Sequence, residues 1–168
     1  MGKSKGKNRR GGGVQVQADG SRAMHSRPTS LEVLSTWTGD SAPSLLVTAD
    51  AERLVVNAPE GWQRLCVEQG VKVAKVSTLC LTDLSPDATG GLPGYQLTAY
   101  DAGLRRMRLC GPRGLAAFQR STRHFMNRDD LAVDVTEVDA GAAVPCLAGD
   151  DRLLRVSAVV VDDAGPPP

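Results

Sequence analysis

The sequence predicts an α/β fold in which helices pack on a β-sheet, and two observations support this expectation. Short runs rich in aliphatic and β-branched residues alternate with segments whose apolar residues recur at helical spacing. The uncharged run VSTLCLT (76–82), with aliphatic residues at both ends of its centre, is typical of a strand covered on both faces. With 168 residues, the chain is long enough for one domain that buries roughly two-thirds of its unfolded surface.

The first elements expected are three strands in a meander. They are LEVLST (31–36), SLLVTA (44–49) and RLVVNA (53–58), and the short connection around Asp50 is typical of a hairpin. A short amphipathic helix follows over 60–70, where Trp62, Leu65 and Cys66 share one face. Asn57 is placed to cap the start of this helix and Gly70 to end it.

The rest of the chain alternates strands and helices. After the strand at 76–82 we expect a helix at 92–103, a strand at 106–111, a helix at 112–125, and strands at 131–138 and within 153–161. The helix at 112–125 carries its core face at helical spacing, on Leu115, Phe118, Thr122 and Phe125.

The charge of the chain is unevenly distributed. Residues 1–28 contain seven Lys or Arg and one Asp, whereas the remainder contains 13 basic and 18 acidic residues. The amino-terminal stretch has nothing to bury, so we expect a disordered basic tail at 1–28, a domain at 29–162 and a Pro-rich tail at 163–168. The basic tail has three open interpretations: an RNA-contacting arm, a nuclear-localisation signal or a solubilising terminus.

Cysteine spacing and hydropathy exclude several classes of protein. The four cysteines form no C-x-x-C pair, which indicates buried free thiols rather than a zinc knuckle or a disulfide framework. No apolar run approaches the roughly 20 residues of a membrane span, and no signal peptide is recognisable. We therefore expect a soluble intracellular protein without a membrane partner.

Four segments, in this order and spacing, carry a resemblance to a known family. They are LEVLSTWTGDSAPSLLV (31–47), NAPEGWQRLCVE (57–68), LTDLSPDATGGLPG (81–94) and GPRGL with STRHF (111–125). Together they resemble the amino-terminal half of long-form tRNase Z, the endoribonuclease that trims tRNA 3′ trailers. The resemblance implies a metallo-β-lactamase-like αββα sandwich, of which this chain would form one half or layer, a mixed sheet with flanking helices.

The resemblance further implies that only the carboxyl-terminal half of the long form holds zinc and cuts RNA. Catalytic members carry a His-x-His-x-Asp-His loop before a Gly-Leu-Pro-Gly-like turn. Alignment on that turn puts other residues at the four ligand positions: Asp83, Ser85, Asp87 and Ala88. A serine hydroxyl is a poor zinc ligand and an alanine methyl is none, so this loop should hold no metal. Zinc is expected in a partner catalytic half. The protein itself is expected in the nucleus, the mitochondrion or both.

The histidine count supports a chain without a catalytic residue. His25 lies in the basic tail and His124 in the last turn of a predicted helix, too few for a dinuclear zinc site. His124 is expected to interact with the helix dipole. A magnesium site at Asp83 and Asp87 is the metal alternative. In the simpler interpretation, Asp87 and Thr89 accept hydrogen bonds from N–H groups of the next turn, and the glycines of ATGGLPG serve backbone geometry.

Arginines are the candidate RNA contacts. A first group crowds a helix-to-strand connection, and a second lies on the polar side of the following helix: Arg105, Arg106 and Arg108, then Arg113, Arg120 and Arg123. Such a cluster either binds phosphates or forms a solvated face. Trp37, Ala58-Pro59 and Trp62 depart from the family pattern, and the two indoles imply a repacked loop region.

The expected function is that of a non-catalytic module in tRNA 3′-end processing. The module would pack on a catalytic tRNase Z half or homologue and help to position pre-tRNA. The alternatives are a stand-alone RNA-binding or scaffold protein and a hydrolase with an unorthodox metal site.

Overall fold

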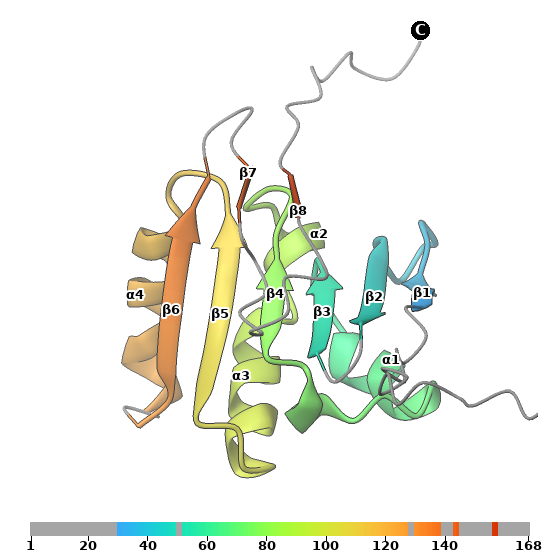
Figure 1. The fold of residues 1–168 in the computed structure, drawn as a ribbon, viewed down its shortest axis with the longest axis horizontal. Helices are drawn as coiled ribbons and strands as arrows, with labels where there is room; N and C mark the ends of the chain where they lie inside the picture. The colour runs from blue at the N-terminus through green and yellow to red at the C-terminus, as the bar shows by residue number, and fades with distance from the viewer. Residues whose placement is uncertain (1–29, 50–51, 128–129, 139–142, 145–155, 158–168) are drawn as a thin grey trace, which may run out of the picture.

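A computed structural model of the chain describes residues 30–49, 52–127, 130–138, 143–144 and 156–157. Six strands form one sheet in the same order as they occur along the chain (Figure 1). They are β1 (Ser30–Ser35), β2 (Ser44–Ala49), β3 (Glu52–Val56), β4 (Thr78–Cys80), β5 (Arg106–Gly111) and β6 (Ala132–Glu137). β1, β2 and β3 pair antiparallel, and β3 to β6 pair parallel. The predicted mixed sheet is therefore confirmed.

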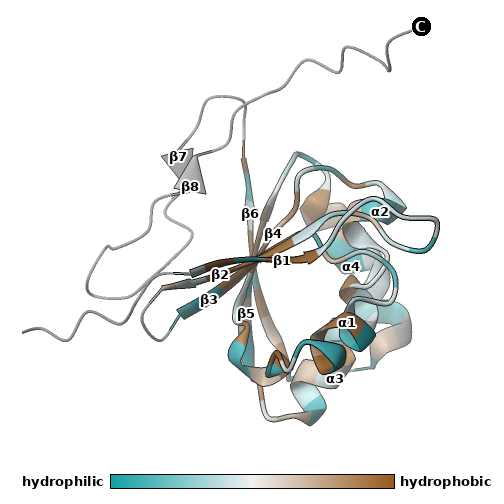
Figure 2. Cartoon of the chain, turned by 90° about the vertical axis from the view of Figure 1, so that its right-hand side faces the viewer, coloured by the Kyte–Doolittle hydropathy of each residue, from teal (hydrophilic) through white to brown (hydrophobic). Residues whose placement is uncertain are grey.

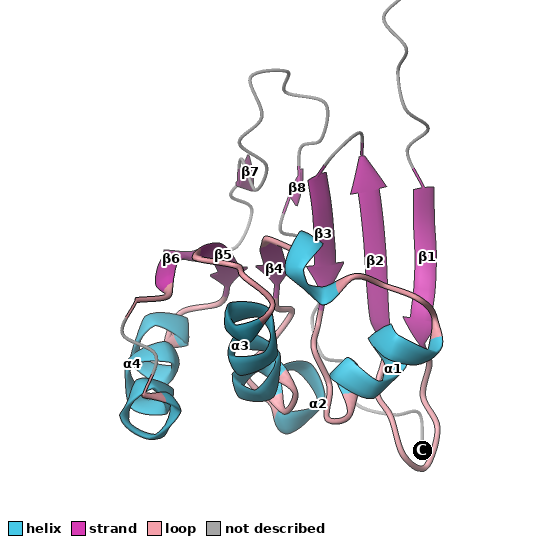
Figure 3. Ribbon diagram, turned by 90° about the horizontal axis from the view of Figure 1, so that it is seen from below, coloured by secondary structure: helices cyan, strands magenta, loops and turns pink. Residues whose placement is uncertain are grey.

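Four helices lie on one face of this sheet (Figures 2 and 3). They are α1 (Trp62–Glu68), α2 (Pro86–Thr89), α3 (Leu92–Asp101) and α4 (Leu115–Met126), and a single 3₁₀ turn follows α1 at Val73–Lys75. Parallel strands require crossover connections, and the helices that follow β3, β4 and β5 supply them. The two-stranded ladder of β7 (Ala143–Val144) and β8 (Val156–Ser157) belongs to a separate sheet.

The main core fills the space between the helices and the sheet. Trp62 and Tyr95 are fully buried there and meet edge to face, with ring centroids 4.9 Å apart and an interplanar angle of 86°. Tyr95 also donates its hydroxyl hydrogen to the carbonyl of Val76. Burial raises the pKa of the Cys66 thiol to about 12, so this thiol is neutral at physiological pH.

The predicted core face of α4 is largely confirmed. Leu115 and Thr122 are buried, and Phe118 is half-buried and packs against the core. The side chain of Phe125 lies outside the described residues, as do Cys146, the two predicted tails and most of the predicted strand at 153–161.

Two local predictions need correction. α1 begins at Trp62 after Gly61, whose φ of 73° is left-handed, and Asn57 does not cap it. Asn57 itself has a φ of 59° and directs its side chain to Thr82, across 25 positions of sequence. The strand predicted at 76–82 is reduced to the three residues of β4, because the chain turns into the loop that leads to α2. Gly70 ends α1 with a φ of 68°, as expected.

The opposite face of the sheet carries a second, smaller apolar cluster. Leu54 and Cys110 are buried there, with Val47, Val56, Cys80 and Val138 packed against them. All four helices lie on the other side, so no described helix covers this cluster (Figure 2). Within the part of the chain that the structure describes, no helix is long and apolar enough to cross a membrane.

Candidate functional site

The candidate site lies where the chain leaves β3 and β4. An open pocket of about 610 Å³ is found there, and the carboxyl ends of parallel strands are where α/β proteins place ligands. Its lining comes from the β1–β2 connection and from the two strand ends: Trp37, Ala42, Pro43, Asn57, Thr82, Asp83, Ser85, Asp87 and Ala88. All four positions of the predicted ligand loop thus line one pocket.

Asp83 is occupied by hydrogen bonds within its own loop. Its Oδ1 accepts the backbone N–H of Ser85 at 2.7 Å, and its Oδ2 accepts the hydroxyl of Thr82 at 3.0 Å. Partial burial acts to raise the pKa of Asp83, but the hydrogen bonds from Ser85 and Thr82 outweigh it, so the net shift is downward. The carboxylate is therefore ionised at neutral pH and serves to hold the turn.

The other three ligand positions form or adjoin the short helix α2. Ser85 precedes its first turn, Asp87 is exposed in that turn, and Ala88 is buried. The hydroxyl of Thr89 donates to the carbonyl of Ser85 at 2.8 Å, and Asp83 accepts the Ser85 N–H. The prediction that Asp87 and Thr89 would accept N–H groups of the next turn is wrong, because Gly90 and Gly91 donate theirs to the backbone carbonyls of Pro86 and Ala58.

The donor set does not fit a zinc centre. Among the four ligand positions, only Asp83 and Asp87 offer charged donors, and Asp83 already accepts two hydrogen bonds. Ala88 is 1% exposed, and its carbonyl accepts the N–H of Ala58 at 2.9 Å, so a bulkier imidazole would have to displace packed backbone. No group of three His, Cys, Asp or Glu side chains that suits a metal occurs among the described residues. His124 lies on α4 and is not part of the pocket lining.

A chain of hydrogen bonds ties this loop to the core. The Asn57 side chain accepts the Thr82 N–H at 2.9 Å and donates to the Thr82 hydroxyl at 3.0 Å. The Asn57 carbonyl accepts the hydroxyl of Ser44 at 2.8 Å, and Ser44 in turn accepts the indole N–H of Trp62 at 3.1 Å. Side chains from β2, α1 and the two strand ends thus fix the loop without a metal ion.

The glycines of the GGLPG segment serve close packing. A Cβ on Gly91 would lie 2.2 Å from the carbonyl oxygen of Pro59 and 3.0 Å from the Cβ of Trp62. A Cβ on Gly94 would lie 2.6 Å from Nε2 of Gln63. The start of α3 therefore approaches the backbone before α1 more closely than any side chain permits, which agrees with the predicted role in backbone geometry.

The two tryptophans that depart from the family pattern have different environments. Trp37 is 68% exposed at the edge of the pocket, whereas Trp62 is fully buried in the main core. Sequence reasoning identified both as departures, but it did not anticipate that Trp62 links the core to the pocket through Ser44.

The six candidate arginines do not share one surface. Arg106 and Arg108 lie on the helix-free face of β5, where their guanidinium groups pair with Asp134 at 2.7 Å and Glu52 at 3.6 Å. Arg105 lies over the ring of Tyr100, with Cζ 4.3 Å from its centroid. Arg120 and Arg123 are exposed on α4, and Arg113 precedes that helix, where the sequence had placed it within the helix.

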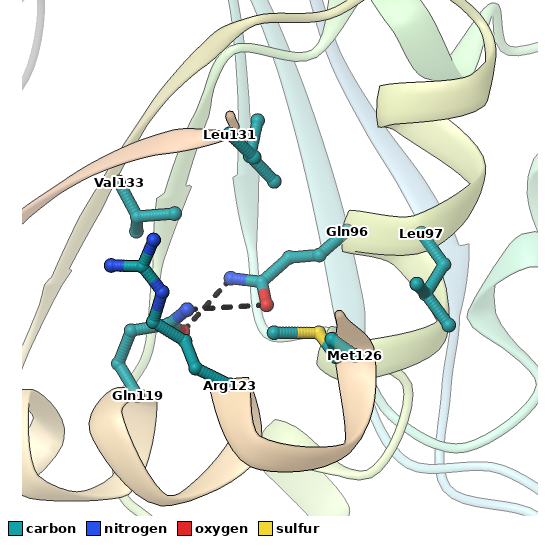
Figure 4. A pocket seen from close by; sticks show the side chains of 7 residues that line it. All are labelled: Gln96, Leu97, Gln119, Arg123, Met126, Leu131 and Val133. Carbon is teal, nitrogen blue, oxygen red and sulfur yellow. Dashed lines mark hydrogen bonds between the residues drawn. The ribbon is translucent and has the colours of Figure 1, made fainter. Parts of the chain in front are cut away.

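A second cavity, between α3, α4 and β6, is too small for a ligand (Figure 4). Its volume is about 10 Å³, room for one water molecule at most. Beside it, the buried amides of Gln96 and Gln119 exchange hydrogen bonds of 2.8 Å and 3.3 Å. This pair satisfies its own polar groups and joins the two helices.

Comparison with solved structures gives the fold class of the chain. The structure is similar to the metallo-β-lactamase fold protein YhfI from Bacillus subtilis, with a TM-score of 0.57 at 12% identity, over 71% of this chain and 50% of that chain. It is also similar to a long-form RNase Z from yeast, with a TM-score of 0.61 at 27% identity, over 68% of this chain and 16% of that chain. The chain has a metallo-β-lactamase fold.

Sequence comparison gives the family. Residues 32–91 match the family model described as tRNase Z endonuclease. The mitochondrial ribonuclease Z of Drosophila melanogaster is 30% identical over 130 residues, which make up 77% of this chain and 16% of that protein. The resemblance to tRNase Z is therefore confirmed in both sequence and structure, and it concerns one part of a long-form protein.

Proposed function

We propose that the chain acts in tRNA 3′-end processing as a non-catalytic module that packs on a catalytic tRNase Z half. The similarity to tRNase Z supports the pathway, and the pocket supports the lack of catalysis. One observation carries the proposal: the four ligand positions offer a hydrogen-bonded Asp83, a serine, an exposed aspartate and a buried alanine. In this proposal the zinc ions belong to the partner half, and this chain helps to position pre-tRNA.

The absence of a zinc site is tested by measuring zinc per chain after saturation and dialysis. Aspartate carboxylates without imidazole ligands bind zinc weakly, so we expect well under about 0.1 zinc per chain. The double variant Asp83→Ala, Asp87→Ala should give the same value. Glu60→Ala removes an exposed carboxylate outside the pocket and serves as the control. One or two zinc ions per chain that disappear in the double variant, but not in the control, would overturn the proposal.

The role as a partner module is tested by adding the chain to a catalytic tRNase Z half and following cleavage of pre-tRNA. We expect no cleavage by this chain alone, and a lower KM for pre-tRNA when both are present, because positioning acts mainly on substrate binding. Unchanged kinetics together with no measurable association would contradict the proposed role. We place this activity in the mitochondrion, the nucleus or both, and the name of the Drosophila relative supports the mitochondrion.

A further inference from the structure

The pocket beyond β3 and β4 combines an exposed indole ring with two carboxylates. Trp37 lines it from the β1–β2 connection and is 68% exposed, and Asp83 and Asp87 line it from the chain that follows β4. No Lys, Arg or His belongs to the described residues of its lining. Because a carboxylate and the face of an indole both attract positive charge, this pocket suits a cation and disfavours a phosphate.

Two groups in the pocket are available to a ligand. Asp83 holds its own turn through the N–H of Ser85 and the hydroxyl of Thr82. By contrast, the carboxylate of Asp87 is exposed and makes no hydrogen bond or ion pair with the described residues, and the indole of Trp37 makes none either. A ligand can therefore contact both groups without breaking a contact of the fold.

The chemistry of these two groups favours a guanidinium group over an ammonium group. A guanidinium group is planar, so it stacks on an indole ring while its N–H groups donate to a carboxylate. An ammonium group is a strongly hydrated point charge without a flat face. The volume of about 610 Å³ is in the range of pockets that hold organic groups.

The chain's own first 28 residues carry charges that match this pocket. That segment contains seven basic residues and one acidic residue, whereas the remainder contains 13 basic and 18 acidic residues. Four of the seven basic residues are arginines: Arg9, Arg10, Arg22 and Arg27. Which of them can reach the pocket depends on the length of chain that connects them to it.

Chain length favours Arg9 and Arg10. β1 and β3 run in the same direction, so β1 ends at the sheet edge that carries the pocket, and Ser30 lies at the opposite edge, one strand length or about 20 Å away (Figure 3). A flexible linker of about 13 residues covers this distance. Arg10 precedes Ser30 by about 20 positions, which is enough, whereas Arg22 and Arg27 would need an almost fully extended chain.

We propose that the pocket binds Arg9 or Arg10, with the guanidinium group between the ring of Trp37 and the carboxylate of Asp87. The basic segment is then held against the domain, and RNA phosphates have to compete with the pocket for these two arginines. The inference goes beyond the proposed function and does not depend on it, because both binding partners belong to this chain.

The contact should be weak but populated. A cation over an exposed ring and an exposed ion pair are each weak interactions. A short connecting segment, however, keeps two sites at an effective concentration in the millimolar range. The Debye length falls from about 30 Å at about 0.01 M ionic strength to about 3 Å at about 1 M. We therefore expect partial occupancy at low salt and loss of the contact at high salt.

The test is the indole N–H signal of Trp37 in ¹H–¹⁵N correlation spectra of the full chain. The chain has two tryptophans, and the fully buried Trp62 gives the internal reference. Between about 1 M and about 0.01 M salt, the Trp37 signal should move by more than its line width while that of Trp62 stays in place. Arg9→Gln with Arg10→Gln should abolish most of this movement, and so should Asp87→Asn alone.

Each variant has a control with the same change of charge. Arg22→Gln with Arg27→Gln removes two charges from the same segment and should keep the movement. Glu68→Gln neutralises an exposed carboxylate on α1, outside the pocket, and should keep it too. Adding Asp87→Asn to the Arg9 and Arg10 substitutions should change nothing further, because both sets remove the same contact.

A Trp37 signal that does not respond to salt overturns the inference. So does a response that survives either set of substitutions, or one that the controls weaken equally. The Trp62 signal shows whether each variant keeps its fold, and if Asp87→Asn were unfolded, the substitutions at Arg9 and Arg10, outside the described domain, would still decide. None of these results bears on zinc content or on pre-tRNA cleavage by a catalytic half, so failure here is distinguishable from failure of the proposed function.

Discussion

Gly91 shows how one residue determines the geometry beside the pocket. Its N–H donates to the carbonyl of Ala58 at 2.8 Å, and its missing side chain lets the start of α3 touch the backbone at Pro59. Because Trp62 is fully buried directly beside this contact, neither neighbour has space to retreat.

We therefore expect Gly91→Ala to destabilise the protein by about 2 kcal/mol or more, through overpacking against backbone. Urea unfolding followed by circular dichroism measures this change. Gly39→Ala is the control: a Cβ added at Gly39 would meet no atom within 4 Å, so the free energy of unfolding should change by less than about 0.5 kcal/mol. Equal changes in the free energy of unfolding at both positions would show that the close approach at Gly91 does not affect stability.

For single residues, the sequence predicts which chemical groups a site offers better than it predicts which side chains touch. The loss of zinc donors at Ser85 and Ala88 follows from residue type alone, since neither a hydroxyl nor a methyl group replaces an imidazole. The contact between Asn57 and Thr82 could not be predicted, because it joins two strand ends 25 positions apart. Asparagine is a preferred helix-capping residue, but the side chain of Asn57 makes the contact with Thr82 instead.

A single carboxylate connects β6 with the start of α4. Oε1 of Glu137, at the end of β6, accepts the N–H groups of Gly114 and Ala116 at 3.0 Å and 2.9 Å. These N–H groups lie at the start of α4, where helical hydrogen bonding leaves donors unpaired and negative charge is favourable. Glu137 thus acts as the cap that no residue of α4 itself supplies.

Glu137→Ala should lower the free energy of unfolding by about 1–2 kcal/mol, the usual cost of losing a charged helix cap. Urea denaturation should show a lower midpoint with an unchanged m-value. Glu68→Ala provides the comparison, because it breaks an exposed 3.7 Å ion pair with Arg64 within α1, and such pairs contribute about 0.5 kcal/mol or less. If the two variants were equally stable, the capping role of Glu137 would be refuted.

Elements with a clear apolar period were predicted nearly to their ends. β1, β2, β5 and β6 and the helices α1, α3 and α4 all fall within a few residues of the expected ranges. The sequence did not predict α2, because a four-residue helix has no period to detect. The length of β4 was overestimated, because its apolar run continues into Leu81, which is buried outside the strand.

For the whole molecule, the distribution of charge bears on RNA binding. The six candidate arginines are spread over the helix-free face of β5, its two ends and α4. The largest positive surplus is instead in the sequence of residues 1–28, with seven basic residues and one acidic residue. Phosphate binding depends on the local density of positive charge, so this segment is the stronger candidate for RNA contact.

Deletion of residues 1–28 should therefore weaken tRNA binding more than Arg120→Ala with Arg123→Ala does. Filter binding across a range of salt concentrations measures both affinity and salt dependence. The logarithm of the binding constant falls with the logarithm of the salt concentration. Each lost phosphate contact should make this negative slope shallower by about 0.7–0.9. If the salt dependence is unchanged by the deletion but becomes weaker in the double arginine variant, the RNA contact lies on α4.

The strand order has a consequence for how the chain reaches this state. Because the order in the sheet is the order of synthesis, each strand from β2 to β6 leaves the ribosome directly after a strand with which it pairs. No strand has to be inserted between two that are already joined, so the sheet can be completed in one direction while translation proceeds.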